Sequence, residues 1–134
     1  MLVSMTILEV LSEKFAEDLA LIDELLGLIP PDAHNWQPNL PAPVFTFGEL
    51  ADHIADARNG CAACFAKLNA AGFHELNEDQ LTQIIPTYFT PTGEPFLAIF
   101  LTNWKHLNHH AYQLFTYLKI YGLPVSTRHL YRFR

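Results

Sequence analysis

The sequence predicts an all-α fold, a four-helix bundle in which the third helix is shortened. Apolar residues recur at spacings of three and four along several segments, and stretches rich in proline or glycine separate these segments. No segment shows the alternation of apolar and polar residues that is typical of strands. With 134 residues the chain can build one hydrophobic core, so we expect a single helical domain over residues 1–134.

The first predicted helix covers residues 6–28. Acidic residues lie between its apolar positions, and Gly27 followed by two prolines ends it. The next segment, residues 29–45, is rich in proline and has no periodicity, so we expect an extended loop. Trp36 in this loop is a candidate lid that packs on the bundle, because lone loop tryptophans are more often plugs than ligand platforms. The apolar positions of the helix are Leu8, Leu11, Phe15, Leu19, Ile22 and Leu26.

The second predicted helix covers residues 46–69 and opens with a capping box. The Thr46 hydroxyl and the Glu49 carboxylate can each accept a hydrogen bond from a backbone amide that the helix itself leaves unpaired. His53 follows one turn later and borders the apolar stripe of this helix. A lone histidine in such a position is usually a hydrogen-bonded residue at the core edge, so its function depends on what lies opposite.

Two cysteines, Cys61 and Cys64, form a Cys-x-x-Cys pair in the same predicted helix. This spacing is typical of a redox pair or of half a zinc site. It also arises when two small apolar residues face the core one turn apart. A thioredoxin-type pair needs a preceding strand and a helix that begins at the first cysteine, and neither is visible here, so the core role is favoured.

One short and one long helix are predicted in the rest of the chain. The short third helix covers residues 76–85 and ends at Pro86. The last helix begins close to Pro95, which a first turn accepts, and runs to about Tyr121. Gly122 is its expected C-cap.

Three histidines lie within five positions of the last predicted helix. His106 and His110 are one turn apart and project from the same side, at the edge of the apolar face. His109 falls on the polar side, so we expect it to be exposed or to support the ligands from outside. Two imidazoles one turn apart can hold a divalent cation between them. A bundle can supply a third ligand from a facing helix, and His53 is the candidate.

A site of three neutral imidazoles has a defined chemistry. It leaves the charge of a divalent ion uncompensated, so a bound water or thiol is easier to deprotonate at neutral pH. Zincin proteases carry Glu directly after the first histidine, where this chain has Leu107, so that mechanism is disfavoured. Polar neighbours are needed to fix the imidazole tautomers. The candidates are Asp52, Asp56, Asn103, Gln113 and Tyr117.

The charge and hydropathy of the chain limit the kinds of binding partner and the cellular compartment that we expect. The formal net charge of −6 argues against nucleic-acid binding, and only residues 128–134 form a basic stretch, which we expect to be an anchored or frayed end. No apolar run reaches the roughly 20 residues that cross a bilayer, so no membrane partner is expected. The first residues lack a positive region of the signal-peptide type, which favours a cytoplasmic location.

Two segments resemble the DinB-like (DinB/YfiT-like) metalloenzyme family. Residues 35–57 are similar to the loop and helix that carry the family's first ligand. Residues 106–114 are similar to the family pattern His-x-x-His-His-x-x-Gln-Leu, and Gly122 and Pro124 then match its Gly-x-Pro-like end. The resemblance covers about half of the chain, including both helices that carry the candidate ligands.

The resemblance implies metal ligation by His53, His106 and His110, with zinc or nickel as the ion, in a four-helix bundle that is often a homodimer. Characterised branches transfer low-molecular-weight thiols (bacillithiol, mycothiol or glutathione) to electrophiles, and a few members are hydrolases or isomerases. The implied function is therefore metal-dependent transfer of a small-molecule thiol to an electrophilic substrate. Beyond the metal ligands, no catalytic residue is assigned.

This chain also departs from the family pattern. Ala111 stands where a small or basic residue is usual, and Tyr112 where glycine is common. The linker between the two ligand helices is short, which truncates the third helix and leaves apolar surface that a second subunit could cover. Two alternatives therefore stay open. One is a non-catalytic dimeric bundle with a structural or vestigial metal site, and the other is a metal-dependent hydrolase with water as nucleophile.

Overall fold

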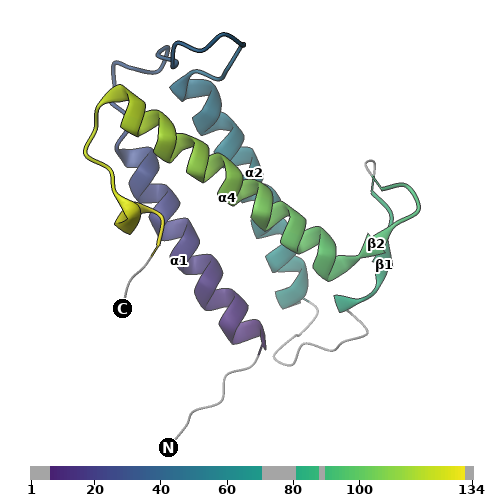
Figure 1. Cartoon of the computed structure of the whole chain (residues 1–134). Coiled ribbons are helices and arrows are strands. Elements are labelled where there is room, and N and C mark those ends of the chain that lie inside the picture. Colours follow the sequence, from purple (N-terminus) through teal and green to yellow (C-terminus); the bar gives the residue numbers. More distant parts are fainter. Residues whose placement is uncertain (1–6, 71–80, 88–89, 132–134) are drawn as a thin grey trace, which may run out of the picture.

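The computed structural model describes residues 7–70, 81–87 and 90–131 (Figure 1). Helices dominate these residues, as the all-α prediction requires. Within the described part, a two-stranded antiparallel sheet and one short 3-10 turn accompany three long helices. The elements in chain order are α1 (Ile7–Gly27), α2 (Phe47–Ala70), β1 (Ile84–Ile85), β2 (Glu94–Pro95), α4 (Phe96–Tyr121) and η1 (Thr127–His129).

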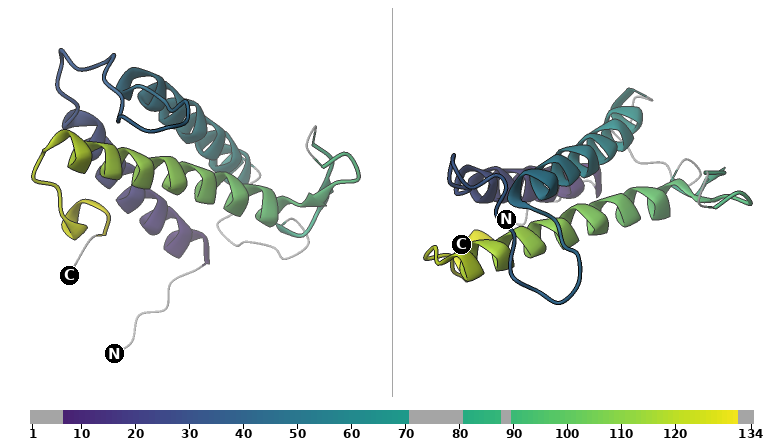
Figure 2. Two further views of the ribbon diagram at one scale, coloured as in Figure 1. Left: turned by 45° about the horizontal axis from the view of Figure 1, so that its top comes forward. Right: turned by 90° about the horizontal axis from the view of Figure 1, so that it is seen from above.

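Helix α4 is the central element of the described fold. It packs against both α1 and α2, so that α4 forms one layer and the other two helices form the second layer (Figure 2). After α4 the chain turns back, and η1 lies against α1 (Figure 1). None of the helices in the described part is both long enough and apolar enough to cross a membrane.

The core lies between α4 and the two other helices, because the apolar periodicity of each helix faces inward. Along α4 the buried residues Leu107, Ala111, Leu114 and Leu118 alternate at spacings of four and three, which keeps them on one side. Fully burying one such side chain contributes about 1.5–3 kcal/mol. The fully or almost fully buried partners from the other two helices are Ile22, Leu25, Leu50, Ile54 and Cys61. Cys61 therefore takes the core role that the sequence favoured.

Polar side chains also join the helices across the layers. The Asp18 carboxylate of α1 accepts hydrogen bonds from Trp104 Nε1 at 2.6 Å and from Asn108 Nδ2 at 3.1 Å, both on α4. Arg58 of α2 pairs with Asp23 of α1. These contacts hold α1 against the other two helices.

The helix ends confirm the capping predictions. The Thr46 amide donates to Glu49 Oε1 at 3.2 Å, and the Glu49 amide donates to Thr46 Oγ1 at 3.1 Å, which is the expected capping box of α2. At the end of α4, Gly122 has φ +109° and its amide donates to the carbonyls of Leu118 and Lys119. A residue with a Cβ is strained at this φ, so glycine is required there.

The proline-rich loop between α1 and α2 is tied to the start of α2. Trp36 stacks on Phe47 with ring centroids 4.8 Å apart and meets the edges of Tyr117 and Tyr121. The Phe47 amide donates to the Trp36 carbonyl at 2.9 Å. The prediction that Trp36 packs on the bundle is therefore confirmed, and its position anchors the loop that precedes α2.

Leu81, the first described residue of the predicted third helix, is helical, but the predicted C-terminal end of that helix is wrong. Residues 76–80 of the expected third helix lie outside the described residues, and Ile84–Ile85 forms strand β1 instead of the helix end. Ile84 pairs with Pro95, and Ile85 with Glu94, so α4 begins at Phe96. β-branched side chains favour extended backbone, and the turn at Gly93 (φ +85°) returns the chain to the first strand.

Candidate metal centre

The three histidines that the sequence singled out lie next to one another. His53 projects from α2, and His106 and His110 project from α4. The His53 and His110 ring centroids are 5.5 Å apart, and those of His106 and His110 are 4.5 Å apart. The His110 ring is therefore the middle member of a cluster that spans two helices. His109 is exposed, as expected from its place on the polar side of α4.

The His53–His110 and His106–His110 ring separations are close to those of rings that share an ion, whereas the arrangement of the three side chains does not match a metal site. Rings that bind one tetrahedral ion through nitrogens at about 2.0–2.1 Å have centroids about 5 Å apart. As the side chains stand, no group of three His, Cys, Asp or Glu residues in the described part of the chain is arranged to hold a metal ion. His53 and His106 are exposed, and the His53 ring packs beside the Phe45 ring. Imidazole nitrogens are ligands that zinc and nickel accept, so the cluster is a candidate metal site by donor type.

Gln113 orients the central histidine. His110 Nδ1 lies 3.1 Å from Gln113 Oε1, and because an amide oxygen only accepts, the hydrogen bond requires a proton on Nδ1. His110 Nε2 is then the nitrogen with a lone pair. An outer partner of this kind commonly fixes the tautomer of a ligating histidine. Gln113, one of the five polar neighbours considered from the sequence, thus lies on a candidate ligand ring.

The electrostatics of the cluster keep His106 neutral. Desolvation, followed by the charges that His110, His109 and His53 would carry, lowers the pKa of His106 below its ordinary value of 6.5. A neutral imidazole is the form that binds metal, because a protonated ring has no lone pair to donate. The cluster therefore favours the metal-binding state of this side chain at neutral pH.

Phe45 covers one side of the cluster, and the sequence analysis missed it. Its ring centroid lies 4.4 Å from that of His53 and 6.2 Å from that of His110. An apolar residue directly before an N-cap commonly packs on the first turn of the helix, and this signal could have placed Phe45 near His53.

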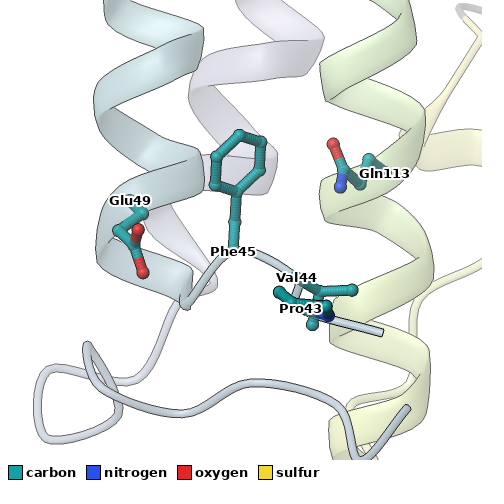
Figure 3. Close-up of a pocket in the computed structure, with 5 residues that line it drawn as sticks. All are labelled: Pro43, Val44, Phe45, Glu49 and Gln113. Carbon is teal, nitrogen blue, oxygen red and sulfur yellow. The ribbon is translucent and has the colours of Figure 1, made fainter. Parts of the chain in front are cut away.

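A pocket of about 340 Å³ adjoins the cluster (Figure 3). Phe45 lies between Glu49 on α2 and Gln113 on α4 in this view. Two of the pocket residues, Phe45 and Gln113, also contact the histidines, so the pocket and the cluster share a wall. The lining residues are Pro43, Val44, Phe45, Glu49 and Gln113.

Tyr117 lies beneath this wall with its hydroxyl buried. The residue is 4% exposed, and its hydroxyl makes no hydrogen bond of ordinary geometry within the described residues. Burial raises the pKa of Tyr117, while the Gln113 side chain and the Phe45 backbone act in the opposite direction, which places both groups close to the hydroxyl. A buried polar group without a partner is rare in folded proteins.

No family model, curated protein or solved structure matches the chain. The site is therefore interpreted from its own geometry, a histidine cluster beside a small pocket in an all-α fold. The resemblance to the DinB-like family stays a prediction from two sequence segments.

Proposed function

We propose that the chain is a metal-dependent enzyme of the DinB-like type, built as a four-helix bundle, that transfers a low-molecular-weight thiol to an electrophile. His53, His106 and His110 would hold one zinc or nickel ion. The observation that carries the proposal is the adjacency of three imidazoles from two helices, at 4.5 and 5.5 Å between ring centroids. Three protein ligands leave an open position for substrate, which is typical of catalytic rather than structural sites.

The chemistry follows from the donor set and its surroundings. When bound, a divalent ion held by neutral imidazoles lowers the pKa of a thiol and supplies a nucleophile near neutral pH. In such a transfer the thiol proton would pass to solvent, the sulfur would bond to the electrophilic carbon, and the leaving group would depart with the electron pair of its bond. Gln113 would keep the His110 ring oriented, and Phe45 would support the His53 ring from one side.

The proposal includes a homodimer formed through α4. Leu101 and Tyr112 are large exposed apolar side chains of this helix, and Tyr112 stacks on Phe115 with centroids 5.8 Å apart. Exposed apolar side chains that lie on one face commonly mark an interface. This surface equally supports the second candidate function, a non-catalytic dimeric bundle. Sedimentation velocity at micromolar protein tests the dimer, and a monomer at all concentrations would contradict it.

Metal analysis of untagged protein tests the proposed site. The protein is incubated with zinc or nickel, dialysed and analysed beside His53→Ala, His106→Ala, His110→Ala and the matched control His109→Ala. We expect about one ion per chain in the parent and in the control, and almost none in the other three variants. Equal metal content in the parent and His110→Ala would contradict the site.

The transfer reaction is tested separately, because metal binding alone does not distinguish an enzyme from a structural bundle. The metal-loaded protein is incubated with a panel of small thiols and a chromogenic electrophile, and product formation is followed by absorbance. We expect acceleration that disappears in His110→Ala and persists in His109→Ala. A metal-loaded protein that accelerates no thiol would favour the non-catalytic bundle.

A further inference from the structure

A small, open pocket lies beside the histidine cluster, with Phe45 and Gln113 common to both. Its volume of about 340 Å³ lies at the lower end of the roughly 300–1,000 Å³ that ligand pockets occupy. Pro43, Val44 and Phe45 make an apolar wall, and Glu49 and Gln113 add polar groups on the two helices (Figure 3). Gln113 and the Phe45 backbone also act on the buried Tyr117 hydroxyl.

The wall of the pocket is held in place before any ligand arrives. The loop that carries Phe45 is anchored by the stack of Trp36 on Phe47. The Gly48 amide donates to the His34 carbonyl at 2.9 Å, and a Cβ at Gly48 would lie only 3.2 Å from that oxygen. The loop therefore approaches the first turn of α2 closely, which fixes the direction in which the apolar wall faces. Such preorganisation reduces the entropy lost on binding.

The charge of the pocket selects a positively charged ligand. Glu49 is the one charged residue among the five that line it, and the capping box uses its Oε1, which leaves Oε2 for a second partner. The face of the Phe45 ring attracts cations as well, through its negative quadrupole. A carboxylate beside an aromatic ring is a recognition site for an organic ammonium group.

The pocket also lies within a short reach of the histidines. Glu49 and His53 are one turn apart on α2, so their Cβ atoms are about 5–6 Å apart. Phe45 contacts the His53 ring and lines the pocket, so it lies between the two groups. We propose that the thiol substrate is an aminothiol, whose ammonium group pairs with Glu49 over the Phe45 ring while its sulfur faces the histidine cluster. The position of the sulfur at the histidine cluster rests on the proposed function, whereas the ammonium site at Glu49 does not.

Isothermal titration calorimetry of the zinc-loaded protein tests the proposal with three thiols of similar length. Cysteamine carries an ammonium group, 2-mercaptoethanol a hydroxyl and 3-mercaptopropionate a carboxylate. Cysteamine also has the most acidic thiol of the three, so it can bind more tightly than 2-mercaptoethanol for that reason alone. The test therefore compares the ratio of the two affinities in the parent protein with the same ratio in Glu49→Gln. Glutamine preserves the capping box and removes the charge.

We expect Glu49→Gln to weaken cysteamine binding by about tenfold and to leave 2-mercaptoethanol within about twofold. The control Asp52→Asn removes a charge from the same helix outside the pocket and should leave both affinities unchanged. An equal loss for both thiols in Glu49→Gln, or no loss for cysteamine, would overturn the proposal while the metal site stands.

Metal-free protein separates failure of this inference from failure of the proposed function. If the parent protein holds no zinc, the proposed function fails, and the ammonium site is then tested with benzylamine and benzyl alcohol by amide chemical shifts. Benzylamine should shift the resonances of Phe45, Glu49 and Gln113 in the parent but not in Glu49→Gln, and benzyl alcohol should shift neither. Equal shifts with both probes, or none with benzylamine, would overturn the ammonium site.

Discussion

His129 and the histidine cluster of His53, His106 and His110 have opposite surroundings. His129 in η1 is 3% exposed, its Nδ1 accepts from the Ser126 amide at 2.9 Å, and its Nε2 lies 3.8 Å from Glu24 of α1. In the cluster, His53 and His106 are exposed, and their nearest ring neighbours are other imidazoles and Phe45. A buried histidine that bonds to the backbone and lies near a carboxylate is part of the fold. Imidazoles gathered at the surface beside a pocket are available to a ligand.

The largest expected effect concerns the stability that His129 provides. His129→Ala removes a buried side chain and its bond to Ser126, so we expect the free energy of unfolding to fall by about 2–3 kcal/mol. Urea unfolding of metal-free protein measures this loss, and His53→Ala serves as the comparison, with a change below about 0.5 kcal/mol. Similar losses in the two variants would break the distinction between the groups.

The next effect concerns Gln113, which joins the histidine cluster to the fold. Gln113→Ala removes the acceptor for His110 Nδ1, and we expect zinc affinity to fall by about tenfold to a hundredfold. Competition with a chelating dye measures the affinity, and the exposed Asn59→Ala on α2 is the control. Unchanged affinity in Gln113→Ala would mean that the His110 tautomer does not depend on this amide.

A smaller effect is expected in how the free energy of unfolding of the metal-free protein depends on pH, through His106 of the cluster. Because the pKa of His106 is lowered in the folded state, the unfolded chain binds more protons below about pH 6.5, and stability is lost as the pH falls through the lowered value. In metal-free protein we expect His106→Gln to reduce the slope of stability against pH between roughly pH 5 and 6.5. An identical slope in parent and variant would show that desolvation and the neighbouring imidazoles do not act on His106.

The smallest expected effect is the change in stability on replacing Tyr117 by phenylalanine, which should differ from that of a hydrogen-bonded buried tyrosine. A hydroxyl with a good partner loses about 1 kcal/mol on replacement by phenylalanine, whereas removing an unpaired hydroxyl is neutral or stabilising. We therefore expect Tyr117→Phe to leave the melting temperature unchanged or to raise it, as differential scanning calorimetry measures. A clear decrease would show that the hydroxyl is hydrogen-bonded in solution.

Local sequence signals predicted most of this structure. The apolar periodicity and the capping signals placed the bounds of α1, α2 and the C-terminal end of α4 within a residue or so, because each signal acts within one or two turns. The adjacency of His106 and His110 followed from helix geometry alone. Placing His53 beside them also required α2 and α4 to face each other, which the resemblance suggested and the fold bears out.

Features that depend on contacts between distant segments were not predictable. The pairing of Ile84 with Pro95 requires a turn between them, and neither short strand shows alternation by itself. The place of Phe45 over His53 depends on how Trp36 anchors the loop. The burial of His129 depends on the return of the chain to α1, which a basic stretch does not indicate.

The most direct test of the central claim is a zinc titration of metal-free protein that follows each histidine ring by NMR. The account predicts that the ring signals of His53, His106 and His110 change together and stop changing at about one equivalent of zinc, while those of His109 and His129 keep their positions. Signals of the three rings that respond at different zinc concentrations, or a response of His109 in place of His53, would contradict a shared three-histidine site.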